Sequence, residues 1–277
     1  MKNMSKTAKF FVTCAVVFTL GLVLTIGGCA AGGAAGIRDI VNGRLPDNGP
    51  AETGMIEGDY EFSSIEARGD ADIVIVSSKY YSGILDDKDI GGVEPLDGKV
   101  VVVYDKNRTA PSVKTEEGRL IIDAEPDNEV RFSNVFEPTV IVFCGSRELE
   151  SVSVNSGACD LEMKGVSFRT ADIDMNAGDV GLRDITSGGL RIEADAGDVE
   201  VAGVLKGVTD VHADAGSVEI EAFTGIRGYT MELHADAGDI QVGEDEIDGN
   251  DFRQQGGSDV IKVRTDAGDI EIGELTA

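Results

Sequence analysis

The chain has 277 residues, 42% hydrophobic and 27% charged, so it is too apolar to be wholly disordered and long enough to bury a sizeable core. Its 51 Asp and Glu against 24 Lys and Arg give a net charge of -27. This charge repels phosphate backbones, so we expect no nucleic-acid partner. Trp is absent and the 36 Gly residues are unusually many, which indicates an aliphatic core and many tight corners.

The N-terminal region has the pattern of a membrane segment. Residues 1–9 hold three lysines and no acid, residues 10–36 carry no charge, and acid-rich sequence follows. A bilayer core needs about 20 apolar residues, and positive flanks stay in the cytoplasm. We therefore expect a cytoplasmic N-terminus (1–9), a transmembrane signal anchor (10–36) in the cytoplasmic membrane and an extracytoplasmic body. Ile26-Gly-Gly-Cys29 also resembles a lipoprotein processing box, so lipidation of Cys29, or an ordinary cleaved signal, are the alternatives.

The next part of the chain reads as a linker followed by strands. Residues 37–57 are rich in Pro, Gly, Asp and Asn and lack apolar periodicity, which predicts a linker. No later stretch keeps a 3.6-residue apolar period, so helices should be few. Short runs rich in β-branched residues, bounded by turn residues, predict strands at 60–67, 72–76, 99–104, 119–122 and 139–144.

The second half of the chain repeats itself. Five copies of a motif close to Asp-Ala-Gly-Asp-Val/Ile, and a degenerate copy at Asn155-Ser-Gly157, recur at intervals of 19 to 30 residues. A period near 20 that tolerates insertions is typical of a solenoid. The glycines of the copies are Gly157, Gly178, Gly197, Gly216, Gly238 and Gly268.

Each copy also marks a change of face. Leu190, Ile192 and Ala194 are apolar at even positions before the motif, and Val199 and Val201 are apolar at odd positions after it. A strand changes face only through a bend or bulge, so each repeat should form two short strands around a glycine corner. We predict an all-β, single-stack β-solenoid over residues 58–277, with ladders of identical positions about 4.8 Å apart.

The sequence resembles the bacterial putative-adhesin domains, which are domains of unknown function built from β-strand repeats. The resemblance is carried by Thr139-Val-Ile-Val-Phe, by Leu149-Glu-Ser-Val-Ser-Val-Asn-Ser-Gly157 and by the recurrent Asp-Ala-Gly-Asp-Ile strands behind an N-terminal membrane segment. It implies a β-solenoid on the outer side of the membrane, often encoded beside envelope-stress genes, and it implies no catalytic residues. One departure is Phe143-Cys144-Gly145, where the family often has a Leu-Pro pair.

The aspartates that flank the corners are candidate Ca²⁺ ligands. Hard cations prefer carboxylate oxygens, and an ion between coils would remove the repulsion within a ladder. Aspartates that only shape turns are the alternative, since their side chains bond nearby backbone amides. Other than Ca²⁺, we expect no cofactor. The candidates are Asp195, Asp198, Asp214, Asp236, Asp239, Asp266 and Asp269.

The only histidines, His212 and His234, lie two residues before successive corner aspartates. Their ladder would hold Asp174, Glu193 and Arg264, which favours a solvated polar column over a Zn²⁺ site. Cys144 and Cys159 are read as two small semi-buried thiols, with a disulfide outside the cell as the alternative.

We expect a non-catalytic cell-surface protein for adhesion, scaffolding or envelope-stress signalling, since the sequence holds no recognisable nucleophile or phosphate motif. A polysaccharide lyase or hydrolase on a β-helix is the alternative, although no Arg/Lys cluster is evident near the ladders. Insertions in solenoids often carry the binding face, so Phe252 and Arg253 in the 244–258 insertion are candidate contacts for a protein or cell-wall partner. The chain stops just after its last corner, which predicts an open strand edge and, at that edge, either self-association or strand addition by a partner.

Overall fold

A computed structural model describes residues 53–81, 93–106, 109–124, 138–223 and 225–275. These residues belong to one compact unit and are all-β, with 21 strands and two short 3-10 helices, η1 (Ser78–Tyr80) and η2 (Ile226–Gly228). In this described part no helix has the length and apolar character needed to cross a membrane. The expected anchor (10–36) and Cys29 lie outside the described residues.

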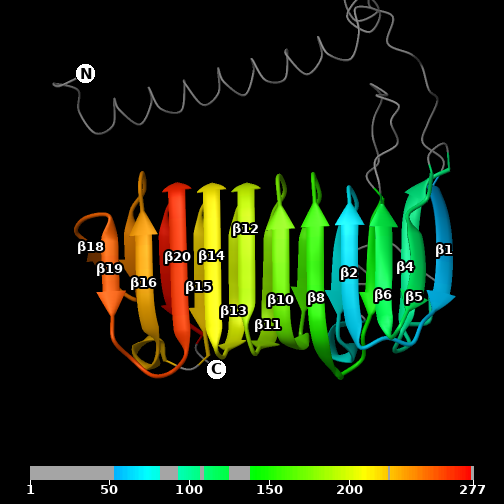
Figure 1. Ribbon diagram of the computed structural model, residues 1–277, viewed down its shortest axis with the longest axis horizontal. Coiled ribbons are helices and arrows are strands. Elements are labelled where there is room, and N and C mark those ends of the chain that lie inside the picture. Colours follow the sequence, from blue (N-terminus) through cyan, green and yellow to red (C-terminus); the bar gives the residue numbers. More distant parts are fainter. Residues whose placement is uncertain (1–52, 82–92, 107–108, 125–137, 224, 276–277) are drawn as a thin grey trace, which may run out of the picture. The chain divides into compact units, whose positions relative to one another are not determined.

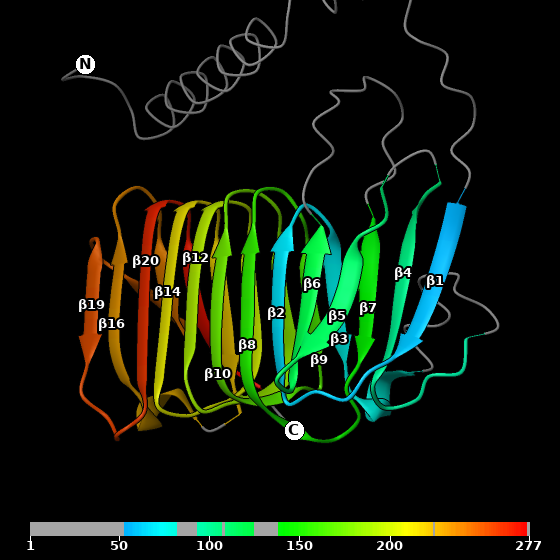
Figure 2. The same cartoon turned by 45° about the vertical axis from the view of Figure 1, so that its right-hand side comes forward.

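The strands form two ladders that face each other across the core (Figures 1 and 2). The front ladder runs, in spatial order, β5 (Ser112–Glu116), β6 (Arg119–Ala124), β2 (Ser64–Gly69), β8 (Glu148–Ser156), β10 (Ser167–Met175), β12 (Leu190–Ala196), β14 (Val208–Ala215), β20 (Val260–Ala267), β16 (Thr230–Ala235) and β19 (Asp251–Gln254).

The back ladder runs β1 (Thr53–Asp59), β4 (Lys99–Asp105), β7 (Thr139–Phe143), β3 (Asp72–Val76), β9 (Leu161–Lys164), β11 (Val180–Ser187), β13 (Val199–Leu205), β15 (Val218–Ala222), β21 (Ile270–Glu274), β17 (Ile240–Val242) and β18 (Asp245–Ile247). One coil consists of a front strand and the back strand that the chain enters after the corner. The coils stack in parallel, as expected for a solenoid-like fold.

The predicted strands are found with small shifts. Four of the five predicted segments coincide with β3, β4, β6 and β7. The fifth, 60–67, spans the break between β1 and β2, because residues 60–63 are an irregular segment that connects them. Strand β1 also includes residues 53–57, which the sequence assigned to the linker, since their partner β4 supplies a full antiparallel register.

The stacking order differs from the chain order, which the sequence did not reveal. The coil of β20 and β21 lies between the coils of β14–β15 and β16–β17, and the coil of β2–β3 lies between those of β6–β7 and β8–β9. Figure 1 shows this directly, because the red β20 separates the orange β16 from the yellow β14. The open edge predicted at the C-terminal coil is therefore wrong, since β21 is paired on both sides.

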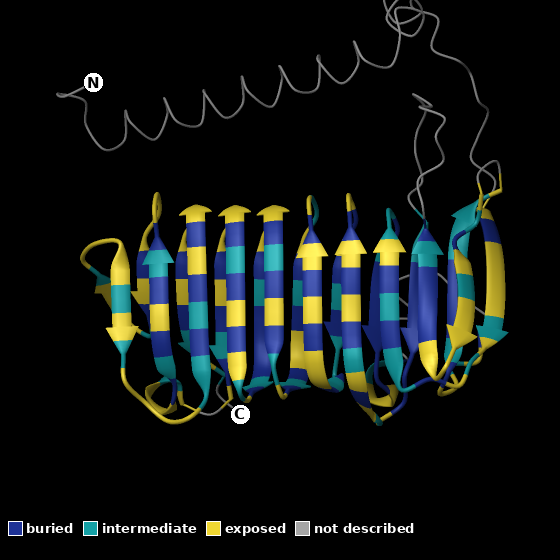
Figure 3. Cartoon of the chain, in the orientation of Figure 1, coloured by how far each residue is buried: buried dark blue, intermediate teal, exposed yellow. Residues whose placement is uncertain are grey.

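Alternation of side chains builds a single aliphatic core. Along β12, Leu190, Ile192 and Ala194 are buried and the residues between them are exposed or partly exposed, and similar stripes appear on the neighbouring strands (Figure 3). Ile192 pairs with Val211, which pairs with Val263, so each coil covers the apolar residues of the next. Burying each such side chain stabilises the fold by roughly 1.5–3 kcal/mol.

The corner glycines form the predicted column. A Cβ placed on Gly197 would meet the carbonyl of Gly178, one on Gly216 that of Gly197, one on Gly268 that of Gly216, and one on Gly238 that of Gly268. Only glycine permits this approach of successive backbones. Gly157 is the exception, because Cys159 occupies the equivalent position beside Gly178. The 21-residue spacing at this copy reflects that offset of two residues.

Antiparallel strands close the parallel stack at both described ends. Strands β18 and β19, both within the 244–258 insertion, pair with β17 and β16, and β5 and β4 pair with β6 and β7. Phe252 of β19 is half-buried and packs on the core. The insertion is therefore an ordered cover of the solenoid end, in which Phe252 serves the core and Arg253 faces solvent.

Candidate functional site

The aspartates that follow the corner glycines form a hydrogen-bonded ladder. The backbone amide of Asp198 donates to Asp179 Oδ1 at 2.9 Å, and the amide of Ser217 donates to Asp198 Oδ1 at 2.8 Å. The amide of Asp239 likewise donates to Asp269 Oδ1 at 2.8 Å. Each side chain thus binds the corner amide of the next coil, which gives the expected Ca²⁺ candidates Asp198 and Asp269 a structural role in the turns.

The aspartates that precede the glycines form a second column, which we call the pre-corner column. It holds Asp195, Asp214, Asp266 and Asp236 in spatial order, at the exposed ends of β12, β14 and β20 and just after β16. Two residues earlier in the chain, His212, Arg264 and His234 lie side by side in the same order. The polar column predicted for the histidines is present, with Arg264 between them.

His234 is held by two carboxylates. Its Nε2 lies 2.9 Å from Asp236 Oδ1, and its Nδ1 lies 3.0 Å from Asp251 Oδ1. Hydrogen bonds to Asp236 and then Asp251 raise the pKa of His234. The pKa of Asp236 is lowered in turn, chiefly by its hydrogen bond to His234 and also by the charge of Arg264, whose Nη2 lies 2.7 Å from Asp236 Oδ2.

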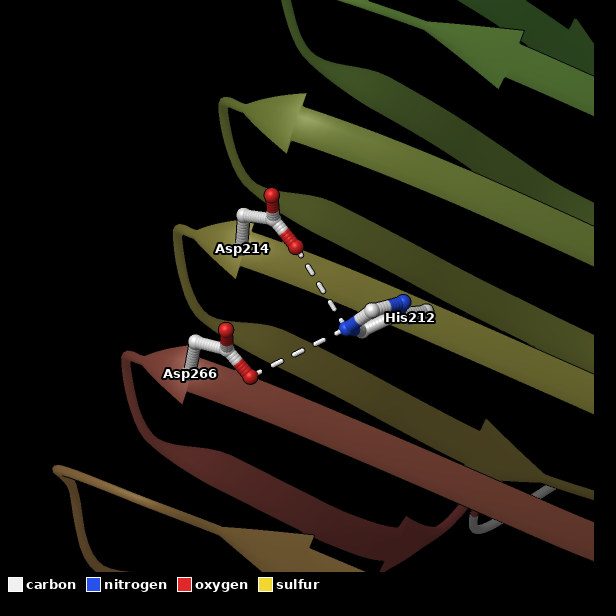
Figure 4. A group of neighbouring side chains, drawn as sticks. All are labelled: His212, Asp214 and Asp266. Atoms are coloured by element: carbon white, nitrogen blue, oxygen red, sulfur yellow. Dashed lines mark ion pairs between the residues drawn. The ribbon is translucent and has the colours of Figure 1, made fainter.

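His212 has a different surrounding (Figure 4). Its Nε2 points between two carboxylates, 3.4 Å from Asp214 Oδ1 and 3.9 Å from Asp266 Oδ1. The ligand atoms of these three residues all lie within 4.8 Å of one another. Imidazole and carboxylate groups at such spacing are able to hold a divalent cation.

An open hollow lies beside the column of His212, Arg264 and His234, on the outer face of the front ladder. Its lining brings together acids and three cations, which corrects the sequence-based view that no Arg/Lys cluster lies near the ladders. Arg253 comes from β19 and the other two cations from β20, the next strand in the chain, and β16 lies between these strands because it pairs with both. Its charged and imidazole lining residues are Asp210, Glu232, His234, Asp251, Arg253, Lys262 and Arg264.

The two described cysteines are buried free thiols. Burial raises the pKa of Cys144 to about 12 and that of Cys159 to about 11. Because the thiolate is the reactive form, neither side chain acts as a nucleophile near neutral pH.

Comparison with known proteins identifies the family. The model of the Toastrack DUF4097 family matches residues 96–272, well over half of the chain. A search of the curated proteins finds no match.

One solved structure shares the fold at low identity, and a second is a weaker match. A putative cell adhesion protein from Clostridium sporogenes ATCC 15579 is 12% identical with a TM-score of 0.51, covering 81% of this chain and 100% of that chain. A putative adhesin from Bacteroides fragilis NCTC 9343 is 11% identical with a TM-score of 0.29, covering 80% and 97%. The family match and the corner repeats agree with the resemblance seen in the sequence, and the chain belongs to the Toastrack DUF4097 family of β-strand-repeat domains of unknown function.

Proposed function

We propose that this protein is a non-catalytic surface protein that acts by binding, in adhesion, scaffolding or envelope-stress signalling. In this proposal residues 10–36 anchor the chain in the cytoplasmic membrane, residues 1–9 stay in the cytoplasm and the solenoid-like body lies outside. The lysine-flanked apolar segment supports the orientation. The name of the Clostridium sporogenes protein, a putative cell adhesion protein with the same fold, supports the class of function.

The observation that carries the proposal is that the interior is filled while both outer faces carry regular charged columns. On the front ladder one column alternates in sign at every step, and it holds Asp172, Arg191, Asp210, Lys262, Glu232 and Arg253. Neighbouring charges in such a ladder stand about 4.8 Å apart. Charges of alternating sign at a fixed spacing are electrostatically complementary to an extended partner that carries repeated charges.

The back ladder carries a column of one sign. Glu200, Glu219 and Glu271 are neighbours in register. The pKa of Glu219 is raised, first by burial and then by the negative charges of Glu271, Glu221 and Glu200. Within the described part of the chain, Glu200 is the member of this column that forms an ion pair, in which Arg183 Nη2 lies 2.6 Å from Glu200 Oε2. A basic partner would therefore be attracted most strongly to the back face.

Topology is tested by labelling intact cells. Val208 is exposed on the front ladder, so Val208→Cys should react with a membrane-impermeant maleimide before the cells are broken. The matched control is Lys2→Cys, which should react only after the cells are opened. Labelling of both positions only in broken cells would refute the extracytoplasmic placement.

Binding is tested with charge variants of the two faces. Cells that lack the chain should attach less to a surface or to one another, and the wild-type chain should restore attachment. Glu219→Gln with Glu271→Gln should restore it poorly, whereas Asp172→Asn on the alternating column should restore it well. If neither attachment nor an envelope-stress reporter responds to loss of the chain, the proposed function is wrong.

A polysaccharide-active enzyme is the second candidate, and the hollow with Arg253, Lys262 and Arg264 favours it. Such enzymes need cations to hold uronate carboxylates and a carboxylate or imidazole to move a proton. Incubation with uronate-containing polysaccharides, followed by assays for unsaturated products and new reducing ends, separates the classes. Turnover that is lost in Lys262→Ala would replace the binding proposal.

A further inference from the structure

The stacking order creates a side-chain cluster that chain order would not. His212 and Asp214 come from β14, and Asp266 comes from β20, which pairs with β14 although 52 residues separate the two aspartates. Strand register places His212 beside Arg264 and Ala215 beside Ala267. The His212 ring therefore reaches across two coils and points between their carboxylates (Figure 4).

The His212 side chain is 42% exposed, but its Nε2 atom is itself buried and has no hydrogen-bond partner among the described residues. A buried polar atom without a partner is rare and often marks a bound ion or water. His234, the equivalent residue two coils away, has both ring nitrogens hydrogen-bonded. The two histidines share sequence context, so the difference comes from what surrounds the ring.

The distances fit a coordination shell better than a hydrogen bond. Nε2 lies 3.4 Å from Asp214 Oδ1 and 3.9 Å from Asp266 Oδ1, both longer than an ordinary hydrogen bond. Two ligands of a tetrahedral Zn²⁺, each about 2.1 Å from the metal, lie about 3.4 Å apart. The first distance matches that value, and a small rotation of Asp266 supplies the second.

We propose that His212, Asp214 and Asp266 bind one divalent transition-metal ion of the Zn²⁺ class, bridging the coils of β14 and β20. The imidazole selects Zn²⁺-type ions over Ca²⁺, which takes six to eight oxygen ligands. Water completes a shell of three protein ligands. This site does not depend on the adhesion proposal, because it lies at the corner end of the front ladder. The protein could bind the metal without acting in adhesion, and it could act in adhesion without binding the metal.

Nearby charges permit a cation at this point. Asp214 and Asp266 each carry a negative charge, and Asp195 continues the pre-corner column on the far side of Asp214. Arg264 competes for Asp266 Oδ1 at 3.2 Å, but its shorter bond, 2.7 Å, goes to Asp236 Oδ2. A metal on Asp266 Oδ1 leaves Oδ2 of the same carboxylate for Arg264.

The test is calorimetric titration of Zn²⁺ into the untagged full-length chain in mild detergent. We expect one tight site per chain, unaffected by excess Ca²⁺. His212→Ala should weaken it by at least about tenfold, because even residues that only support a metal ligand cost that much when removed. His234→Ala is the matched control and should change the affinity by less than about twofold, since His234 supplies no ligand.

Three results would overturn the proposal. They are no tight Zn²⁺ site, equal loss in His212→Ala and His234→Ala, or displacement of Zn²⁺ by Ca²⁺, which would indicate general binding to the acidic surface. Asp214→Asn is the second variant and should weaken the site as His212→Ala does. Thermal melts of every variant in chelator show whether the fold is intact, and Co²⁺ absorption reports an imidazole-containing shell directly.

Discussion

One added methyl group at the glycine column tests the stack most directly. Gly216 lies between Gly197 and Gly268, and a Cβ placed on it would stand 1.9 Å from the Gly197 carbonyl oxygen. An ordinary contact needs about 3.4 Å, so Gly216→Ala must separate the two coils locally by about 1.5 Å. The clash is with a backbone atom and not with the end of a flexible side chain, so it is relieved only by a shift of the backbone.

The cost follows from the hydrogen bonds at this corner. Two hydrogen bonds join these coils at the corner: the amide of Gly197 donates to Ala215 O at 3.0 Å, and the amide of Ser217 donates to Asp198 Oδ1 at 2.8 Å. A shift of about 1.5 Å breaks bonds of this length. Two lost hydrogen bonds cost about 1 kcal/mol each, and overpacking costs about 1–3 kcal/mol more. Gly216→Ala should therefore lower the free energy of unfolding by about 3–5 kcal/mol. In a unit of this size, that lowers the melting temperature by roughly 10 °C.

Gly181→Ala is the matched control. Its added Cβ would lie 3.9 Å from Leu161 O, an ordinary contact. Replacing such a glycine by alanine restricts the unfolded chain, so stability should stay level or rise by less than about 1 kcal/mol. The assay is thermal unfolding of the full-length chain, followed by far-ultraviolet circular dichroism. If Gly216→Ala melts within about 2 °C of Gly181→Ala, the close-packed glycine column is wrong.

Two further predictions test the coil order and the histidine column. The pair Val208→Cys and Val260→Cys should form a disulfide on oxidation, because these residues are paired in register, whereas Val208→Cys with Thr230→Cys should not, since two coil spacings, about 9.6 Å, exceed disulfide reach. A nuclear magnetic resonance titration should show a raised pKa for His234 that falls in Asp236→Asn. Because the folded pKa is the higher one, this contribution to stability is complete below about pH 6.5 and is lost as pH rises through the raised value.

The sequence was sufficient for the repeating unit. The switch of apolar parity around Asp195-Ala-Gly-Asp198 fixed the corner, and Val199 and Ala194 are both buried on either side of it. The corner could be predicted because its two determinants are visible in a single copy of the repeat. They are the glycine required where backbones meet and the alternation of apolar residues along each strand. The all-β class and the cover of one coil by the next follow from that unit.

The order of the coils could not be read from the repeats, because their core residues are interchangeable. Val211, Val263 and Leu233 fill equivalent layers, so the aliphatic core fits either order of the last two coils. A signal exists on the outer face. Placing Lys262 between Asp210 and Glu232 alternates the charges, whereas chain order would put the two acids side by side.

The sequence named Asp214 and Asp266 as candidate metal ligands, but it did not group them with His212, for the same reason. His212 and His234 were compared as neighbours, but Arg264 separates them and Asp266 takes the place beside Asp214 that Asp236 would hold in chain order. The orphaned nitrogen of His212 depends on ring orientation, which no sequence pattern records. Site prediction in repeat proteins therefore depends on which copies touch.

The position of β20 and β21 also constrains how the chain reaches its native state. Strands β16 and β17 leave the ribosome before β20 and β21, yet they have no native parallel partner until that later coil has been made. Coil-by-coil folding along the chain therefore stops after β15. It is completed when β20 and β21 insert between the coils of β14–β15 and β16–β17, so the last coils form together in one cooperative step. Shortened chains that lack residues 260–274 should leave two bare inner edges and recruit each other.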